Sequence, residues 1–242
     1  MMMAGCASTL HVANGEPFTT GNASFDDFFT AVRAVRAEAR AAPRDEDAAH
    51  AGLIAALGLS PRAGTERTLE EAGARARKLK ERGILLHLEI APEPRFVALR
   101  GKAALGPEGE ALLKAMESAT QASLEMRKHL AAVATRAAEL EKRRADLRSQ
   151  APTAFRDEPV LKHAEIMAEL DGARAVLADA GEGATRASGA AARFVVDLVQ
   201  VVETGALDPN RMASSPTKKG WAPKAAPAAL PPKKKGSDDF EP

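Results

Sequence analysis

Cysteine, tyrosine and long apolar runs are scarce or absent in this 242-residue chain. Its single cysteine, Cys6, excludes an internal disulfide framework and a metal site built from several cysteines. Tyrosine is absent and aromatic residues make up only 4% of the sequence, although a compact enzyme normally fills its core and lines its pocket with aromatic side chains. No apolar run approaches the roughly 18 to 20 residues that a membrane-spanning helix requires.

The charge of the chain is almost balanced, with 34 basic and 33 acidic side chains and a net charge of +1. A dedicated nucleic-acid binder needs a basic excess, so nucleic acid is not expected as a partner. Hydrophobic residues make up 45% of the sequence, which is typical of a globular chain, and much of that fraction is alanine. This composition favours long helices packed in a thin layer.

The first 23 residues differ from the rest because they contain one charged side chain, Glu16, and no apolar periodicity. They predict a flexible tether. Residues 24–106 then predict a small helical region, in which one helix ends at Pro43, a second at Gly58 and a third near Gly83.

Within this region, residues 84–100 follow a different period. Apolar residues alternate with others from Ile84 to Ile90, which is the spacing of a strand, and residues 95–100 supply a second short run after two prolines. The sequence therefore predicts a short β-hairpin over residues 84–100. A two-stranded hairpin is marginal alone, so we expect it to pack on the helices.

Two long segments carry residues at the strict 4,3 spacing of a coiled-coil seam. The first seam lies between residues 107 and 150 and contains Leu112, Met116, Ala119, Ser123, Met126, Leu130, Val133, Ala137, Leu140, Arg144 and Leu147. Only its serine and its arginine interrupt the apolar character. The second seam lies between residues 157 and 204 and contains Ile166, Leu170, Ala173, Leu177, Ala180, Ala184, Ala187, Ala191, Phe194, Leu198 and Val201.

A short connection with Pro152 and Pro159 joins the two segments. The fold class is therefore mostly α, and residues 107–205 predict a long antiparallel helical hairpin that resembles a coiled coil. Pairing seam positions whose numbers add to 306 or 307 sets large residues against small ones at several levels, and it places Leu130 beside Leu177. Ser123 has no obvious partner, so Ser123→Ala is expected to be neutral or mildly stabilising.

The sharpest motif in the chain is Met3-Ala4-Gly5-Cys6. It resembles the lipobox of bacterial lipoproteins, in which a small residue precedes a cysteine that is diacylated and becomes the mature N-terminus. The resemblance implies that Cys6 carries a lipid and that Ala7 begins the tether. A signal peptide also needs a basic and an apolar region before the lipobox, so we expect the true start to lie upstream. The alternative is an accidental match, with a free cysteine in a frayed N-terminus.

The other residues predict no catalytic, cofactor-binding or metal site. His129 and His163 lie on the two arms of the predicted hairpin, about 22 Å apart along it, and the other three histidines fall in unrelated segments. No nucleophile-elbow motif is present, and Gly181-Glu182-Gly183 lies inside a predicted helix rather than after a strand, where a phosphate loop would need it.

Residues 206–242 are rich in proline, alanine and lysine and predict a disordered tail. Its lysines suit an anionic surface, or they flank Trp221 in a short linear motif. The alternative is a solubilising tail without a partner.

These patterns predict a non-enzymatic lipoprotein of the bacterial cell envelope, lipid-anchored and facing the periplasm, with a structural or partner-binding role. The expected partners are a membrane, through lipidated Cys6, and a protein bound on the helical hairpin. No cofactor and no small-molecule substrate are expected. The alternative is a cytosolic coiled-coil adaptor or scaffold that uses the same hairpin without a lipid anchor.

Overall fold

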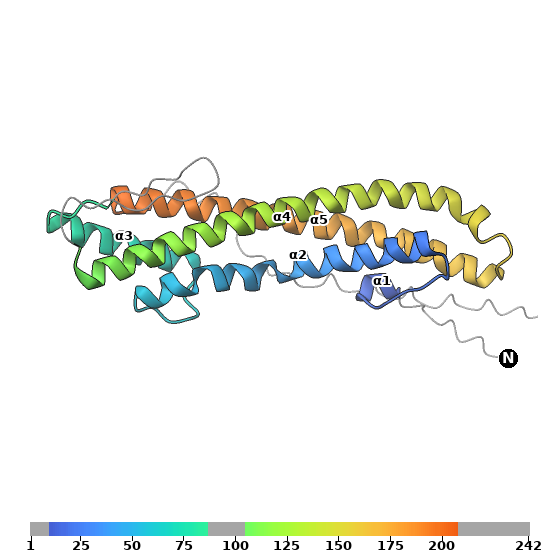
Figure 1. The fold of residues 1–242 in the computed structure, drawn as a ribbon, viewed down its shortest axis with the longest axis horizontal. Coiled ribbons are helices and arrows are strands. Elements are labelled where there is room, and N and C mark those ends of the chain that lie inside the picture. Colours follow the sequence, from blue (N-terminus) through green and yellow to red (C-terminus); the bar gives the residue numbers. More distant parts are fainter. Residues whose placement is uncertain (1–9, 87–104, 208–242) are drawn as a thin grey trace, which may run out of the picture. The chain divides into compact units, whose positions relative to one another are not determined.

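A computed structural model describes residues 10–86 and 105–207 of the chain. These residues are mostly helical, which confirms the mostly α part of the predicted fold class, and they contain no strand. Their helices, in chain order, are α1 (His11–Asn14), α2 (Ala23–Ala56), α3 (Thr65–Glu81), α4 (Gly106–Ala154) and α5 (Val160–Thr204) (Figure 1).

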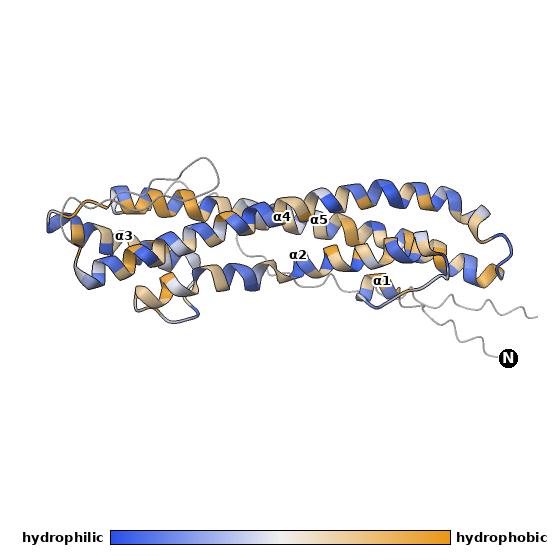
Figure 2. Ribbon diagram, in the orientation of Figure 1, coloured by the Kyte–Doolittle hydropathy of each residue, from blue (hydrophilic) through white to orange (hydrophobic). Residues whose placement is uncertain are grey.

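Helices α4 and α5 pack against each other as a helical hairpin, as the two seams predict. All seam residues of α4 except Leu140 are buried, and so are all those of α5 except Ala187. Helical periodicity alone determines which face of each helix is buried, because residues three and four positions apart lie on the same face. Figure 2 shows the result as apolar residues alternating with polar ones along each helix.

The predicted pairing of the two seams is wrong. Ala137 lies against Gly181, Arg127 against Ser188 and Arg148 against Asp171, so paired numbers add to between 315 and 319 rather than to 306 or 307. The displacement is about eleven residues, or roughly 16 Å of helix. It arises because α4 continues through Pro152 to its last residue, Ala154, and the turn lies over residues 155–159.

Helix α2 also differs from the prediction, because it continues through Pro43 instead of ending there. It packs against both α4 and α5, so the described helices form a three-helix bundle rather than a hairpin with a separate helical region (Figure 1). A proline inside a helix costs about 3 kcal/mol. The apolar residues that α2 buries on both sides of Pro43, among them Phe28 and Leu53, offset that cost.

Helix α3 packs against the C-terminal end of α5, at the end of the bundle opposite the α4–α5 turn (Figure 1). Gly73 allows this approach, since a Cβ atom there would lie only 3.0 Å from the carbonyl oxygen of Gly205. Helix α3 begins at Thr65, and the Thr68 hydroxyl donates a hydrogen bond of 3.0 Å to the carbonyl oxygen of Gly64.

Residues 10–22 differ from the predicted tether. They include α1, and Val12 is completely buried against the bundle. Sequence periodicity could not indicate this docking, because the backbone amides of His11 and Val12 bond Glu169, more than 150 positions away. Residues 1–9 lie outside the described residues.

The predicted β-hairpin is not supported. Ile84, Leu85 and Leu86, which the alternation placed in the first strand, form no strand, and Ile84 and Leu86 are buried beside α3. The remainder of that prediction, residues 87–100, and the predicted tail from residue 208 onward lie outside the described residues.

Candidate functional site

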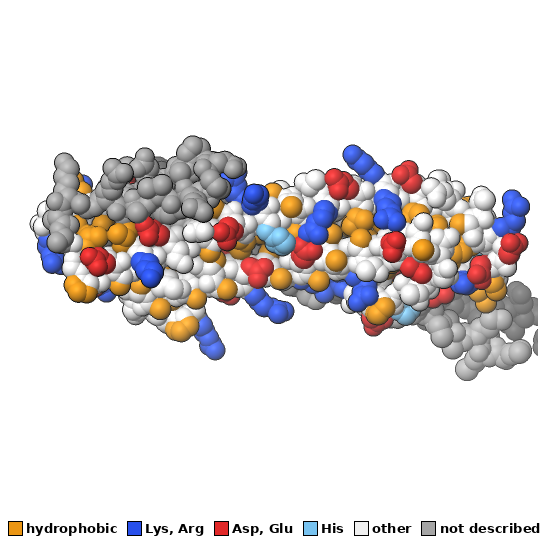
Figure 3. All heavy atoms as spheres, in the orientation of Figure 1, with side chains coloured by type: hydrophobic (Ala, Val, Ile, Leu, Met, Phe, Trp, Pro, Cys, Tyr) orange, Lys and Arg blue, Asp and Glu red, His pale blue; other side chains and the backbone are white. Residues whose placement is uncertain are grey.

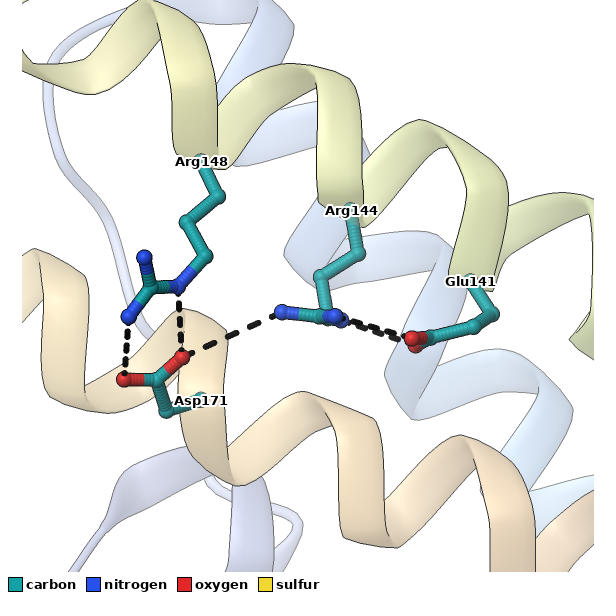
Figure 4. Close-up of polar contacts among 4 residues, drawn as sticks. All are labelled: Glu141, Arg144, Arg148 and Asp171. Carbon is teal, nitrogen blue, oxygen red and sulfur yellow. Dashed lines mark hydrogen bonds and ion pairs between the residues drawn. The ribbon is translucent and has the colours of Figure 1, made fainter.

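Two helices of the bundle meet through a cluster of four charged side chains (Figure 4). Arg144 of α4 occupies a seam position and is 7% exposed. It donates two hydrogen bonds of 2.8 Å to Glu141 on the same helix. Arg148, one turn further along, donates two hydrogen bonds to Asp171 of α5, at 2.8 and 3.1 Å. The guanidinium of Arg144 also lies 3.9 Å from Asp171.

The electrostatics of this cluster favour its ionised state. The hydrogen bonds to Glu141 raise the pKa of Arg144, and the hydrogen bond from Arg148 lowers the pKa of Asp171. A buried guanidinium is costly unless it is paired, so this arrangement explains how the seam accepts Arg144. The cluster holds α4 and α5 in register; its chemistry is that of ion pairs.

A second polar cluster lies inside the bundle, where His50 of α2 meets Ser123 of α4 and Phe194 of α5. His50 is 3% exposed, its Nε2 atom lies 3.2 Å from the Ser123 hydroxyl, and its ring stacks on Phe194 with a centroid distance of 3.7 Å. Burial lowers the pKa of His50 to about 4, although the neighbouring carboxylate of Asp47 acts in the opposite direction. The imidazole is therefore neutral at physiological pH.

Ser123 thus has a partner, and the expectation that Ser123→Ala is harmless loses its basis. The partner comes from 73 residues away, which no local pattern could indicate. A serine beside a neutral histidine also has the chemistry of a nucleophile and its base. Both side chains are closed off from solvent here, so no substrate has access to the serine hydroxyl in this conformation.

A third polar group, Glu169 of α5, attaches the N-terminal segment to the bundle. Its carboxylate is 1% exposed and accepts hydrogen bonds from the backbone amides of His11, at 2.6 Å, and Val12, at 3.0 Å. These amides begin α1 and have no partner within that helix. The carboxylate also suits the positive end of the helix dipole. Residue 169 directly precedes the seam residue Leu170, and this proximity to the seam was its only sequence signal.

Aromatic side chains gather at the same end of the bundle. Phe25 at the start of α2 contacts Phe155 of the α4–α5 turn in an edge-on arrangement, with a centroid distance of 4.8 Å. Phe18 contacts His11 and, at 5.1 Å, Phe29. Phe18, Phe25, Phe29 and Phe155 therefore hold α1, the start of α2 and the hairpin turn together at one end of the bundle (Figure 1).

The outer surface of residues 10–86 and 105–207 includes two apolar features that bear on function. A shallow groove between α4 and α5 is floored by small residues, with charged side chains at its rim; its lining includes Ala134, Ala138, Ala178, Gly181, Arg174 and Glu182. The second feature is the pair Val160 and Leu161, which begins α5 and is 84% exposed. On the face shown in Figure 3, acidic and basic side chains are intermixed.

The site residue predicted from the sequence, Cys6, lies outside the described residues. Over residues 10–86 and 105–207, no three metal-ligating side chains of histidine, cysteine, aspartate or glutamate come together, and no helix has the length and apolar character needed to cross a membrane. His129 contacts Glu38 of α2 at 3.3 Å, while His163 lies on α5 near the hairpin turn.

No protein-family model matches the chain, and no curated protein and no solved structure is significantly similar to it.

Proposed function

We propose that this protein is a non-enzymatic lipoprotein of the bacterial cell envelope, anchored through Cys6, whose helical bundle has a structural or partner-binding role facing the periplasm. The observation that carries the proposal is the lipobox-like Met3-Ala4-Gly5-Cys6, whose cysteine lies four positions before Leu10, the first described residue. An acylated Cys6 would hold the bundle close to the bilayer by this short connection.

The docking of α1 supports this role mechanically. Force on the anchor would pass from residue 10 to the bundle through Glu169, the buried Val12 and the aromatic contacts of Phe18. An anchored protein benefits from such an attachment, because a frayed N-terminal segment would let the bundle move freely above the membrane.

A protein partner is the natural ligand of the groove between α4 and α5. Its floor of alanine and Gly181 would allow a helix of the partner to approach closely, and the charges of Arg174 and Glu182 at the rim would select its register. We propose an α-helical segment as the partner, with small residues facing the groove.

The deciding experiment expresses the gene with its native upstream sequence in a bacterial host and feeds the cells an alkyne-labelled fatty acid. The wild-type protein should incorporate the label and partition into detergent, and Cys6→Ser should lose both properties. A Ser8→Ala variant, two residues away, serves as a control that keeps the cysteine. Equal solubility and no label in all three proteins would reject the anchor and favour the cytosolic adaptor.

A further inference from the structure

We propose that the tip of the α4–α5 hairpin is a membrane-contact surface, in which Val160 and Leu161 enter the interfacial layer of the bilayer. The inference rests on the proposed anchor at Cys6, because the anchor determines which end of the bundle meets the lipid. Both side chains are 84% exposed, far more than any other valine or leucine in the described residues. Single exposed apolar residues are ordinary, but this is an adjacent pair at the end of a bundle.

The position of the pair relative to the anchor carries the argument. Leu10 packs on α5 at Gly172, where an added Cβ atom would lie 2.8 Å from the leucine side chain. Gly172 is about 17 Å from Leu161 along the helix, whereas the other end of α5, at Thr204, is about 48 Å away. Helix α1 and the hairpin turn therefore lie toward the same end of the bundle (Figure 1).

The length of chain between the anchor and the bundle then limits where the bilayer can be. Cys6 lies four positions before Leu10 in the sequence, and even a fully extended chain spans at most about 14 Å over those four steps. A bilayer that holds the acyl chains of Cys6 must therefore lie within about 14 Å of Leu10, which is comparable to the distance from Leu10 to the tip. A bundle standing on this end brings Val160 and Leu161 to the lipid surface.

The charges at the tip indicate what kind of contact it makes. Arg156 and Lys162 are balanced by Asp157 and Glu158, and Lys162 pairs with Glu158 at 3.0 Å. With no net charge, the tip is neither attracted to nor repelled by anionic lipids, so the contact depends on apolar burial. It should be insensitive to salt and to the fraction of anionic lipid. The anchor retains the protein at the membrane, and the tip sets its orientation.

The single cysteine allows a test that supplies the lipid chemically. Full-length protein is coupled through Cys6 to vesicles of zwitterionic phosphatidylcholine that contain a maleimide lipid, and coupled vesicles are isolated by flotation. A tryptophan probe is placed at the tip as Leu161→Trp in a Trp221→Phe background, and brominated phosphatidylcholine serves as the quencher. Val196→Trp is the matched control, since Val196 is 47% exposed on the same helix, about 52 Å from the tip.

The tip probe should shift its emission to shorter wavelength and be quenched by brominated lipid, while the Val196→Trp probe should remain unquenched. Adding Val160→Asp to the tip probe should abolish the quenching without changing the melting temperature, because Val160 is exposed in the folded protein. Equal quenching of both probes would mean that the bundle lies flat, and quenching of neither would mean that the tip stays in water; each result overturns the inference.

The vesicle experiment tests the membrane-contact surface independently of the proposed lipid anchor. Acylation in cells is tested by the fatty-acid label, whereas the vesicle experiment attaches the lipid whether or not a cell would do so. A labelled protein with an unquenched tip would keep the anchor and reject the membrane-contact surface. Quenching at the tip of a protein that cells do not acylate would reject the anchor alone.

Discussion

Acidification should destabilise the protein through His50. In the folded state burial lowers the pKa of this imidazole to about 4, whereas in the unfolded chain it returns to its ordinary value near 6.5. The unfolded state therefore binds the proton more tightly between these two values. The stability that the neutral histidine provides is fully present above pH 6.5, and it is lost progressively as the pH falls toward 4.

The size of the effect follows from the two pKa values. At pH 5 almost every unfolded chain carries the proton on His50 and few folded chains do, which lowers the free energy of unfolding by about 2 kcal/mol relative to pH 8. Below pH 4 the loss approaches about 3 kcal/mol. For a domain whose total stability is ~5 to 15 kcal/mol, this is a large share.

Urea unfolding followed by circular dichroism at several pH values between 4.5 and 8 measures this free energy. Other groups also titrate in this range, so wild type is compared with His50→Leu, which removes the buried imidazole. The variant should have a flatter profile, while Lys128→Gln, at an exposed position of α4, should keep the wild-type slope. If His50→Leu and wild type remained parallel from pH 8 to pH 5, the imidazole would not be buried as the structure has it.

Three further predictions concern the packing of the bundle. In a Cys6→Ser background, the pair Ala137→Cys and Gly181→Cys should form an intramolecular disulfide, since their Cβ atoms would be about 3.4 Å apart. The bond should stabilise the fold by roughly 4 kcal/mol. The control pair Leu130→Cys and Leu177→Cys should stay reduced, and the reverse result would restore the register predicted from the sequence. Glu169→Ala should accelerate amide hydrogen exchange over residues 10–16 and lower the free energy of unfolding by about 1 to 3 kcal/mol. Glu165→Ala, at an exposed position one turn earlier, should leave the exchange unchanged. Equal protection in both variants would mean that α1 docks without the carboxylate. Leu130→Ala, at a completely buried position, should lower the free energy of unfolding measured by chemical denaturation by about 2 to 5 kcal/mol. Leu161→Ala, at an exposed position, should lower it by only a few tenths of a kcal/mol. Similar losses in both variants would contradict the burial of Leu130.

The burial of the two seams could be predicted from the sequence because it depends on local periodicity. An apolar residue at every third or fourth position fixes which face of a helix turns inward, whatever that face meets. This is why Leu112, Met116 and Leu130 on one helix, and Leu170 and Leu198 on the other, are buried as expected.

The pairing of the seams could not be predicted in the same way. A slide of about eleven residues is three helical turns, so it returns the same faces to contact. Where most partners are alanine, such as Ala180, Ala184 and Ala187, many alternative pairings set a large residue against a small one. The turn decides between them, and the prolines located it wrongly because α4 continues past Pro152 to Ala154. Pro152 leaves one amide-to-carbonyl hydrogen bond of the helix unmade, and the burial of the neighbouring Ala151 and Phe155 offsets that loss.

The long α2 and the docked α1 were missed for a related reason. A proline predicts the end of a helix when only local energy is counted, and Pro43 satisfies that rule. The contacts that continue α2 past it, and those that hold His11 and Val12 on Glu169, join residues far apart in the sequence. No window along the chain contains both partners.

The two polar residues that interrupt the first seam were read from the sequence as defects, yet each has a partner in the fold. Ser123 meets His50 of α2, and Arg144 meets Glu141 and lies 3.9 Å from Asp171 of α5. An apolar seam rich in alanine barely distinguishes one register from another, whereas a slide of α5 along α4 would separate Asp171 from both Arg148 and Arg144. A slide of α2 along α4 would separate Ser123 from His50 and would cost about 1 to 3 kcal/mol for the buried polar group left without a partner. We therefore infer that leucine and alanine drive the burial of the seam, that the contacts of Asp171 favour the observed register of α5 against α4, and that Ser123 favours the observed register of α2.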